Sequence, residues 1–145
     1  MNQDLDADLV AGALQVSIGL LRRRLRQTQA DGELTLPETA ALARLDRSGP
    51  ATSSALAKLE QISPQSMGAT LGALESRGLV QRRPDPEDGR RIVISLTTSG
   101  RQALQKRRTA RTEQLAQALS TGFTQEELGQ LMAAAPLLER LAQSI

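Results

Sequence analysis

Apolar residues at the start of the chain recur with the spacing of an α-helix. Between about Asp6 and Gln27 they return every three or four positions and so share one face, namely Leu9, Ala13, Val16 and Leu20, flanked by Ile18, Leu21 and Leu25. After a break at residues 30–32, Thr35 precedes Glu38 by three positions, which is the arrangement of a capping box. The pattern therefore predicts two amphipathic helices in this part of the chain.

Two short helices joined by a tight turn are predicted next. Residues 52–54 (Thr-Ser-Ser) offer capping side chains for the first, and Ser63-Pro64 offers an N-cap and a first-turn proline for the second. The second helix ends at Arg77-Gly78, where glycine suits a left-handed cap, and its inward positions are Met67, Leu71 and Leu74. Because only residues 61–62 separate the two helices, the pattern predicts a helix-turn-helix.

The hydrophobic period changes from helix to strand after Gly78. Residues 79–83 have the pattern of a strand, and residues 84–89 are dense in turn-forming Pro, Asp and Gly. Residues 91–96 are rich in β-branched side chains, with three apolar positions on one face (Ile92, Ile94 and Leu96). This pattern predicts a β-hairpin, and a helix-turn-helix followed directly by a hairpin is a winged helix.

Two further helices are predicted after the hairpin. The first runs from Thr97 to about Leu119, and the second begins with another capping box, from Thr124 to Glu127. Pro136 is expected to kink or interrupt the last helix, because proline lacks the backbone donor that a helix interior needs. The predicted fold class is therefore mainly α with a small β-hairpin wing.

The residue types that are missing exclude several functions. The 145 residues contain no Cys and no His, which excludes thiol chemistry, imidazole catalysis and nearly all structural zinc sites. A nucleophile elbow, a phosphate loop and a dinucleotide fingerprint are also missing. We therefore predict no enzymatic activity, no catalytic residue, no metal and no cofactor. An RNA-binding module is a further alternative, but Phe123 is the single aromatic residue available for base stacking.

The net charge of +2 is distributed unevenly. Residues 77–111 contain ten basic and three acidic residues, a local net charge of +7 that suits a surface facing phosphates. A run such as residues 106–111 is also typical of a solvated helix face. No apolar run approaches the roughly 20 residues of a membrane span, and the N-terminus is acidic where a signal peptide is basic. The expectation is a cytoplasmic protein with no membrane partner.

Two groups of residues are candidates for contacting DNA. The outward side of the second short helix carries small or polar residues that would admit it into a major groove, namely Gln65, Ser66, Gly68, Ala69 and Thr70. At the hairpin tip, Asp88 precedes Arg90, whose guanidinium could enter a narrow minor groove while Asp88 pairs with it. Each feature also has a simpler interpretation: a solvated helix face, and an exposed ion pair that stabilises a turn.

In combination these segments resemble the MarR family of winged helix-turn-helix transcriptional regulators. The likeness covers nearly the whole chain in order, and it rests on Asp88-x-Arg90 followed by five residues and Leu96-Thr97, on residues 74–80 (Leu-Glu-Ser-Arg-Gly-Leu-Val), on residues 36–45 and 49–52, and on residues 97–100 (Thr-Thr-Ser-Gly). The resemblance implies one MarR-like domain over residues 1–145. Its winged helix-turn-helix would occupy about 35–97, and its dimerisation helices about 1–30 and 98–145.

The resemblance also implies roles for individual residues. Residues 65–70 would contact bases, and the wing would contact DNA through Asp88, Arg90 and Arg91. Phosphates would be contacted by Ser53, Arg77 and Arg83. Relatives often carry Thr and Arg where this chain has Gly68 and Ala69, and another Arg where it has Gly89. Direct base contacts are therefore expected to be fewer here, with more dependence on DNA shape.

The implied partners are double-stranded DNA and a second copy of the chain. A repressor would act as a homodimer on a palindromic operator, with recognition helices roughly 34–36 Å apart. The apolar stripes of the first and last helices also favour a dimer, although packing within one chain would give a larger monomer. A winged helix that only docks or scaffolds other proteins is the remaining alternative. The resemblance further implies a small-molecule effector of unknown identity. The arginines of residues 22–26 are interpreted as a solvated helix end rather than as its site.

Overall fold

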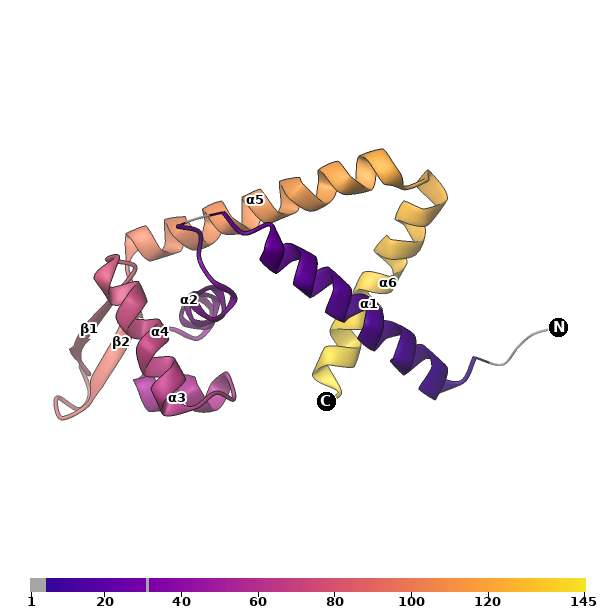
Figure 1. Ribbon diagram of the computed structural model, residues 1–145. Helices are drawn as coiled ribbons and strands as arrows, with labels where there is room; N and C mark the ends of the chain where they lie inside the picture. Colours follow the sequence, from indigo (N-terminus) through magenta and orange to yellow (C-terminus); the bar gives the residue numbers. More distant parts are fainter. Residues whose placement is uncertain (1–4, 31) are drawn as a thin grey trace. The chain divides into compact units, whose positions relative to one another are not determined.

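The computed structural model describes residues 5–30 and 32–145 and is mainly helical (Figure 1). The elements in chain order are α1 (Ala7–Gln27), α2 (Leu36–Ser48), α3 (Ser53–Leu59), α4 (Pro64–Ser76), β1 (Val80–Pro84), β2 (Ile92–Leu96), α5 (Thr98–Gly122) and α6 (Gln125–Gln143). The acidic N-terminal residues 1–4, and Asp31 in the break predicted at 30–32, lie outside the described residues. The chain divides into two units, one up to Glu33 and one from Leu34 onward.

The helices begin at side chains that cap them. The N-cap side chain of each accepts a hydrogen bond from a backbone N–H of the first turn, and these caps are Asp6, Thr35, Thr52, Ser63, Thr97 and Thr124. Both predicted capping boxes are complete, because Glu38 and Glu127 in turn accept from the backbone N–H of Thr35 and Thr124. Such a cap satisfies a donor that the helix leaves without a partner and contributes about 1 kcal/mol. The predicted helix starts are confirmed.

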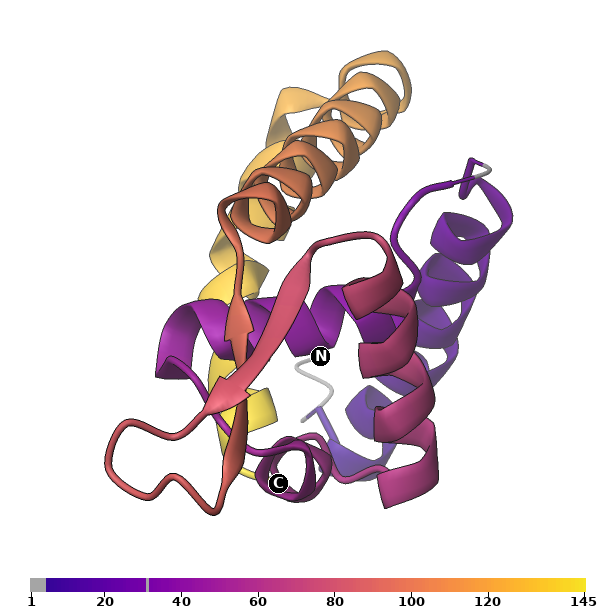
Figure 2. The same cartoon turned by 90° about the vertical axis from the view of Figure 1, so that its left-hand side faces the viewer.

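The core of the second unit lies between α2, α3, α4 and the hairpin (Figure 2). The predicted inward positions of α4 are all buried, and they pack with residues of the neighbouring elements, namely Leu42 and Leu45 of α2, Leu56 of α3 and Ile94 of β2. Burial of each large aliphatic side chain contributes about 1.5–3 kcal/mol. This cluster therefore holds α4 with one face inward and leaves its opposite face on the surface.

β1 and β2 form the predicted hairpin, with boundaries that differ slightly from the prediction. They pair antiparallel, with Val80 opposite Leu96 and Pro84 opposite Ile92. β1 begins at Val80 rather than at residue 79, and Pro84 belongs to the strand instead of the turn. Proline is tolerated at this position because it is the last residue of β1, which is an edge strand of the sheet.

The buried side chains of β2 do not all lie on one face of the strand. Ile92 is 48% exposed, although it shares a face with the buried Ile94. Val93 and Ser95, which point to the opposite face, are both buried. Alternation therefore predicts which side chains share a face, but the protein covers both faces of β2 in its middle and neither at the hairpin tip.

α5 starts on the connection between α4 and β1. The Thr97 hydroxyl donates to the carbonyl of Gly78 at 2.7 Å, and the Thr97 backbone N–H donates to the carbonyl of Leu79 at 3.2 Å. Gly100 is buried so closely against Leu79 that a Cβ there would overlap the carbonyl oxygen. The next turn buries Leu104. The first two turns of α5 are thereby docked on the segment that ends α4.

The rest of α5 and the whole of α6 contribute little to this core. α5 continues to Gly122, past its predicted end near Leu119, and extends away from α2–α4 (Figure 1). α6 buries no residue and continues through Pro136, so of the two predicted effects of this proline the interruption is wrong, while the kink stays a prediction. Proline removes one backbone donor, but residues 133–135 are alanines and residues 137–138 are leucines, strong helix formers that maintain the adjacent turns.

α1 is an amphipathic helix that buries none of its residues. Leu9 is 71% exposed and Val16 is 65% exposed, and the other large apolar side chains of the stripe are also exposed except Leu25, which is half-buried. Arg24 and Arg26 occupy its last turn, where cations interact favourably with the helix dipole. Among residues 5–30 and 32–145, the helices lack the combination of length and apolarity that a membrane crossing needs.

Candidate nucleic-acid interface

The outward side of α4 presents the residues predicted to contact bases. Gln65, Ser66 and Ala69 are exposed, and Gly68 and Thr70 are half-buried. They alternate with the buried positions because every third or fourth residue of α4 faces the core. The structure therefore brings the predicted residues together on one accessible surface at the start of the helix.

Ser66 also takes part in capping α4. Its hydroxyl accepts from the hydroxyl of Ser63 at 2.9 Å, while its backbone N–H donates to the same Ser63 oxygen at 3.1 Å. A hydroxyl offers one donor and two acceptor sites, so Ser66 retains hydrogen-bonding capacity beyond the cap.

The hairpin tip is organised by backbone hydrogen bonds around Asp88. One carboxylate oxygen of Asp88 accepts from the backbone N–H of Arg90 at 3.1 Å, and its carbonyl accepts from the N–H of Arg91 at 3.0 Å. The carbonyl of Arg91 accepts from Asp85 at 2.8 Å and closes the loop. Asp88 thus orients the backbone of Arg90, whereas its carboxylate was expected to pair with the guanidinium.

Several basic residues of the positive segment 77–111 are paired with carboxylates of other elements. Arg82 of β1 lies 2.6 Å from Glu75 of α4, and both Arg101 and Arg108 of α5 approach Asp46 of α2, at 3.5 and 3.8 Å. These pairs neutralise part of the charge that the sequence places here. The +7 segment is therefore a smaller cationic surface than its composition indicates.

The wing retains cations without such partners. Arg83, Arg90 and Arg91 are exposed, and within the part of the chain that the structure describes no carboxylate lies within ion-pair distance of their side chains. The hairpin tip extends away from the helices (Figure 2). The remaining positive charge is therefore concentrated on an extension that can reach a phosphate backbone or a narrow groove.

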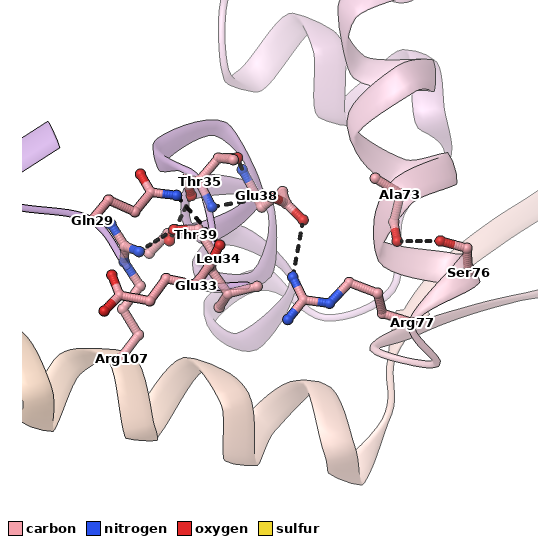
Figure 3. Close-up of polar contacts among 10 residues, drawn as sticks. All are labelled: Gln29, Glu33, Leu34, Thr35, Glu38, Thr39, Ala73, Ser76, Arg77 and Arg107. Carbon is pink, nitrogen blue, oxygen red and sulfur yellow. Dashed lines mark hydrogen bonds and ion pairs between the residues drawn. The ribbon is translucent and has the colours of Figure 1, made fainter. Parts of the chain in front are cut away.

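Two further predicted phosphate contacts lie at helix ends. Ser53 is the first residue of α3 and is half-buried, next to the cap Thr52. Arg77 is the C-cap of α4, and its guanidinium lies 3.7 Å from a carboxylate oxygen of Glu38 (Figure 3). The structure thus links the end of α4 to the start of α2.

The acidic partners of these arginines were not predicted from the sequence. Glu38 was identified only as part of a capping box, and Glu75 and Asp46 were not singled out. Each lies on a different element from its arginine, as much as 62 positions away for Asp46 and Arg108. No local spacing could indicate such pairs. Among the described residues, moreover, no cluster of three acidic side chains could hold a metal ion.

Comparisons with known proteins agree on one family. The model of the MarR family matches residues 34–92, from the start of α2 into the hairpin. A transcriptional regulator of the helix-turn-helix type from Mycobacterium tuberculosis is 35% identical over 135 residues, which is 92% of this chain and 94% of the relative. A transcriptional repressor of the same type and organism is 36% identical over 104 residues, 71% of this chain and 74% of the relative.

Solved structures show the same architecture. A Pseudomonas aeruginosa protein, provisionally assigned as a transcriptional regulator, is 37% identical with a TM-score of 0.80, covering 99% of this chain and 98% of its own. A MepR-like protein complexed with pseudoligands is 31% identical with a TM-score of 0.57, covering 94% and 95%. The predicted fold class is confirmed. The chain belongs to the MarR family of helix-turn-helix transcriptional regulators and is a regulator rather than an enzyme.

Proposed function

We propose that this chain is a sequence-specific repressor that binds double-stranded DNA as a homodimer on a palindromic operator in the cytoplasm. The observation that carries the proposal is the position of the exposed face of α4 beside a hairpin on which Arg83, Arg90 and Arg91 have no described carboxylate partner. A helix with small outward side chains fits a major groove about 12 Å wide. The neighbouring cations supply the attraction to phosphate that DNA-binding proteins depend on.

The residues divide into three roles in this proposal. Gln65 can bond adenine bidentately, and the other outward residues (Ser66, Gly68, Ala69 and Thr70) allow close approach and contact base edges. Arg90, with Asp88 and Arg91, contacts the minor groove. Ser53, Arg77 and Arg83 contact phosphates and fix the position of the helix on the duplex.

A homodimer accounts for the apolar faces of α1 and α6. Both helices bury none of their residues, although each carries a row of large apolar side chains. Exposed apolar surface of this extent marks an interface in soluble proteins. In this proposal residues 1–145 form one domain whose terminal helices, about 1–30 and 98–145, pair with those of a second copy.

Repression and ligand release are proposed from the relatives. A relative at 36% identity is a repressor, and a structural neighbour at 31% identity is complexed with pseudoligands. We therefore propose that a small molecule releases this repressor from DNA by binding better to a conformation that does not fit the operator.

Selection from random duplex DNA with the purified protein tests the proposal. The expected result is enrichment of a palindrome with half-sites one helical turn apart. Enrichment of a single half-site would contradict the proposed dimer but would still support DNA binding. Binding without any sequence preference would contradict the operator, and no binding at low salt would instead support a protein-docking or scaffold role.

A further inference from the structure

Glu38 lies where a carboxylate can compete with DNA for an arginine. One of its oxygens, Oε1, accepts from the backbone N–H of Thr35 at 3.0 Å in the capping box of α2. The other, Oε2, lies 3.7 Å from Nη1 of Arg77 (Figure 3). The Glu38 side chain is 10% exposed and that of Arg77 is 42% exposed. The cap therefore holds the carboxylate in place, at the edge of the surface that Arg77 occupies.

We propose that Glu38 weakens the interaction of Arg77 with DNA phosphates and so lowers the affinity of the protein for DNA of any sequence. This inference rests on the proposed DNA binding and on the phosphate role of Arg77. Glu38 thus acts on DNA binding through Arg77, in addition to capping α2. Because phosphate contacts carry no direct sequence information, Glu38 adjusts the strength of binding and not the choice of operator.

A carboxylate beside Arg77 could affect DNA binding in two opposite ways. It could hold the guanidinium in the orientation that a phosphate needs and so strengthen binding, or its negative charge could repel the phosphate and so weaken binding. Orientation requires a hydrogen-bonded fork with distances near 2.7–2.9 Å. The 3.7 Å separation is too long for such a bond, and Arg77 keeps much of its side chain in solvent. The electrostatic competition therefore outweighs the orientation.

The pair is also weak enough for DNA to displace. Partly exposed ion pairs contribute little to stability, because water screens them and the arginine loses side-chain freedom. A phosphate brings a full negative charge and can accept two hydrogen bonds from one guanidinium. The negative charge of Glu38 nevertheless remains close to the DNA, where it repels the phosphate and reduces the release of counterions on binding.

The substitution Glu38→Gln separates competition from capping. Glutamine retains the acceptor that the capping box needs but carries no charge. Binding of a random-sequence duplex is measured by fluorescence anisotropy over a range of KCl concentrations. We expect Glu38→Gln to raise the affinity about twofold to fivefold at low salt, the range of a partly exposed ion pair. In an Arg77→Gln background the same substitution should have a much smaller effect.

Two matched variants control the experiment, and thermal unfolding verifies that each is folded. Glu38→Ala is also neutral at this position and leaves the bond from the residue 38 backbone N–H to the Thr35 hydroxyl, so it should raise the affinity too. Glu60→Gln makes the same change in charge but breaks a pair with Arg44, whose N–O distance is 2.8 Å. It should raise the affinity less, because Arg77 is not involved.

Other results would contradict either the inference about Glu38 or the proposed DNA binding. Unchanged or weaker binding by folded Glu38 variants, while the parent binds duplex DNA, would overturn the inference and leave the proposed function intact. An equal gain with and without Arg77, or an equal gain in Glu60→Gln, would overturn it as well. If the parent itself binds no duplex at low salt, the proposed function fails and the inference fails with it.

Discussion

Some arginine side chains of this protein form an ion pair with a carboxylate, and others have no carboxylate within ion-pair distance among the described residues. Arg82 is 2.6 Å from Glu75, whereas Arg83, the next residue, has no such partner among the described residues. Side chains alternate between the two faces of a strand, so neighbouring arginines meet different surroundings. One helps to attach the hairpin to α4, and the other remains available for DNA. Counting charges along the sequence does not make this distinction.

Replacing Arg90 by alanine should weaken the binding of all duplexes. Arg90 is exposed on the wing and has no described ion-pair partner, so its loss removes one cationic contact. The slope of log K against log salt concentration should fall by about one unit. Titrations at several salt concentrations measure this slope. Arg140→Ala on α6 removes the same charge and should leave the slope unchanged, so equal changes in both variants would contradict the wing role.

Replacing Gln65 by alanine should alter sequence preference at a single base pair. Gln65 is exposed in the first turn of α4, where a side chain can reach a base edge. The expected cost on the selected operator is about 1–3 kcal/mol, with little change on random DNA. Competition binding with operators that each differ at one base pair measures this preference. Equal weakening on every sequence would make Gln65 a backbone contact instead.

Ser95 is a buried polar residue whose replacement should stabilise the protein. It is 5% exposed, and among the residues that the structure describes its hydroxyl has no hydrogen-bond partner. Removing such a group relieves a desolvation cost, so Ser95→Ala should raise the free energy of unfolding by about 1 kcal/mol. Ser63→Ala removes an N-cap and should lower it by about 1 kcal/mol. Denaturant unfolding compares the two, and a less stable Ser95→Ala would show that the hydroxyl has a partner in solution.

At the scale of elements, the connection from α4 to β1 joins three parts of the winged helix. Arg77 at its start pairs with α2, and the carbonyls of Gly78 and Leu79 accept hydrogen bonds from Thr97 at the start of α5. Gly78 has a positive φ of 72°, which glycine adopts without strain and which ends α4. The end of α4 is therefore coupled to both α2 and α5 through a few residues.

Gly100→Ala should disrupt the docking of α5. A Cβ at this position would overlap the carbonyl oxygen of Leu79, a backbone atom that cannot move without shifting β1. Overpacking of a core typically costs about 1–3 kcal/mol. Gly72→Ala on the exposed side of α4 meets no atom within 4 Å and should instead stabilise the helix by up to about 1 kcal/mol. Thermal unfolding measures the stability of both variants. Equal stabilities would contradict the close contact between Gly100 and the Leu79 carbonyl.

At the scale of the whole molecule, the apolar surface is divided between a core and two exposed helices. The second unit buries most leucines of α2–α4, namely Leu42, Leu45, Leu56, Leu71 and Leu74, but α1 and α6 bury none of theirs. Burial of apolar area is the main favourable term in association, so these helices have most to gain from a second chain. The helix-turn-helix and the hairpin need no partner to form their core.

Leu138→Glu should shift the proposed homodimer towards monomer. Leu138 belongs to the apolar stripe of α6 and is 39% exposed in the single chain. Burying a carboxylate without a partner in an apolar interface costs several kcal/mol. Gln130→Glu adds the same charge at an exposed polar position of α6 and should remain dimeric. Sedimentation velocity distinguishes the two, and a dimeric Leu138→Glu would place the interface elsewhere.

The sequence by itself determined which segments fold and where the helices start. Capping residues, turn residues and the hydrophobic period act over a few positions, so the helix-turn-helix, the hairpin and the outward face of α4 could be predicted from them, whereas the phosphate-contacting roles of Ser53, Arg77 and Arg83 came from the family resemblance. Pro136 was the exception, because the helix formers on both sides of it preserve α6. Tertiary structure alone decided which arginines are neutralised, that Glu38 faces Arg77, and that Ser95 is buried without a hydrogen-bond partner among the described residues. These depend on contacts between residues far apart in the chain, which local patterns do not contain.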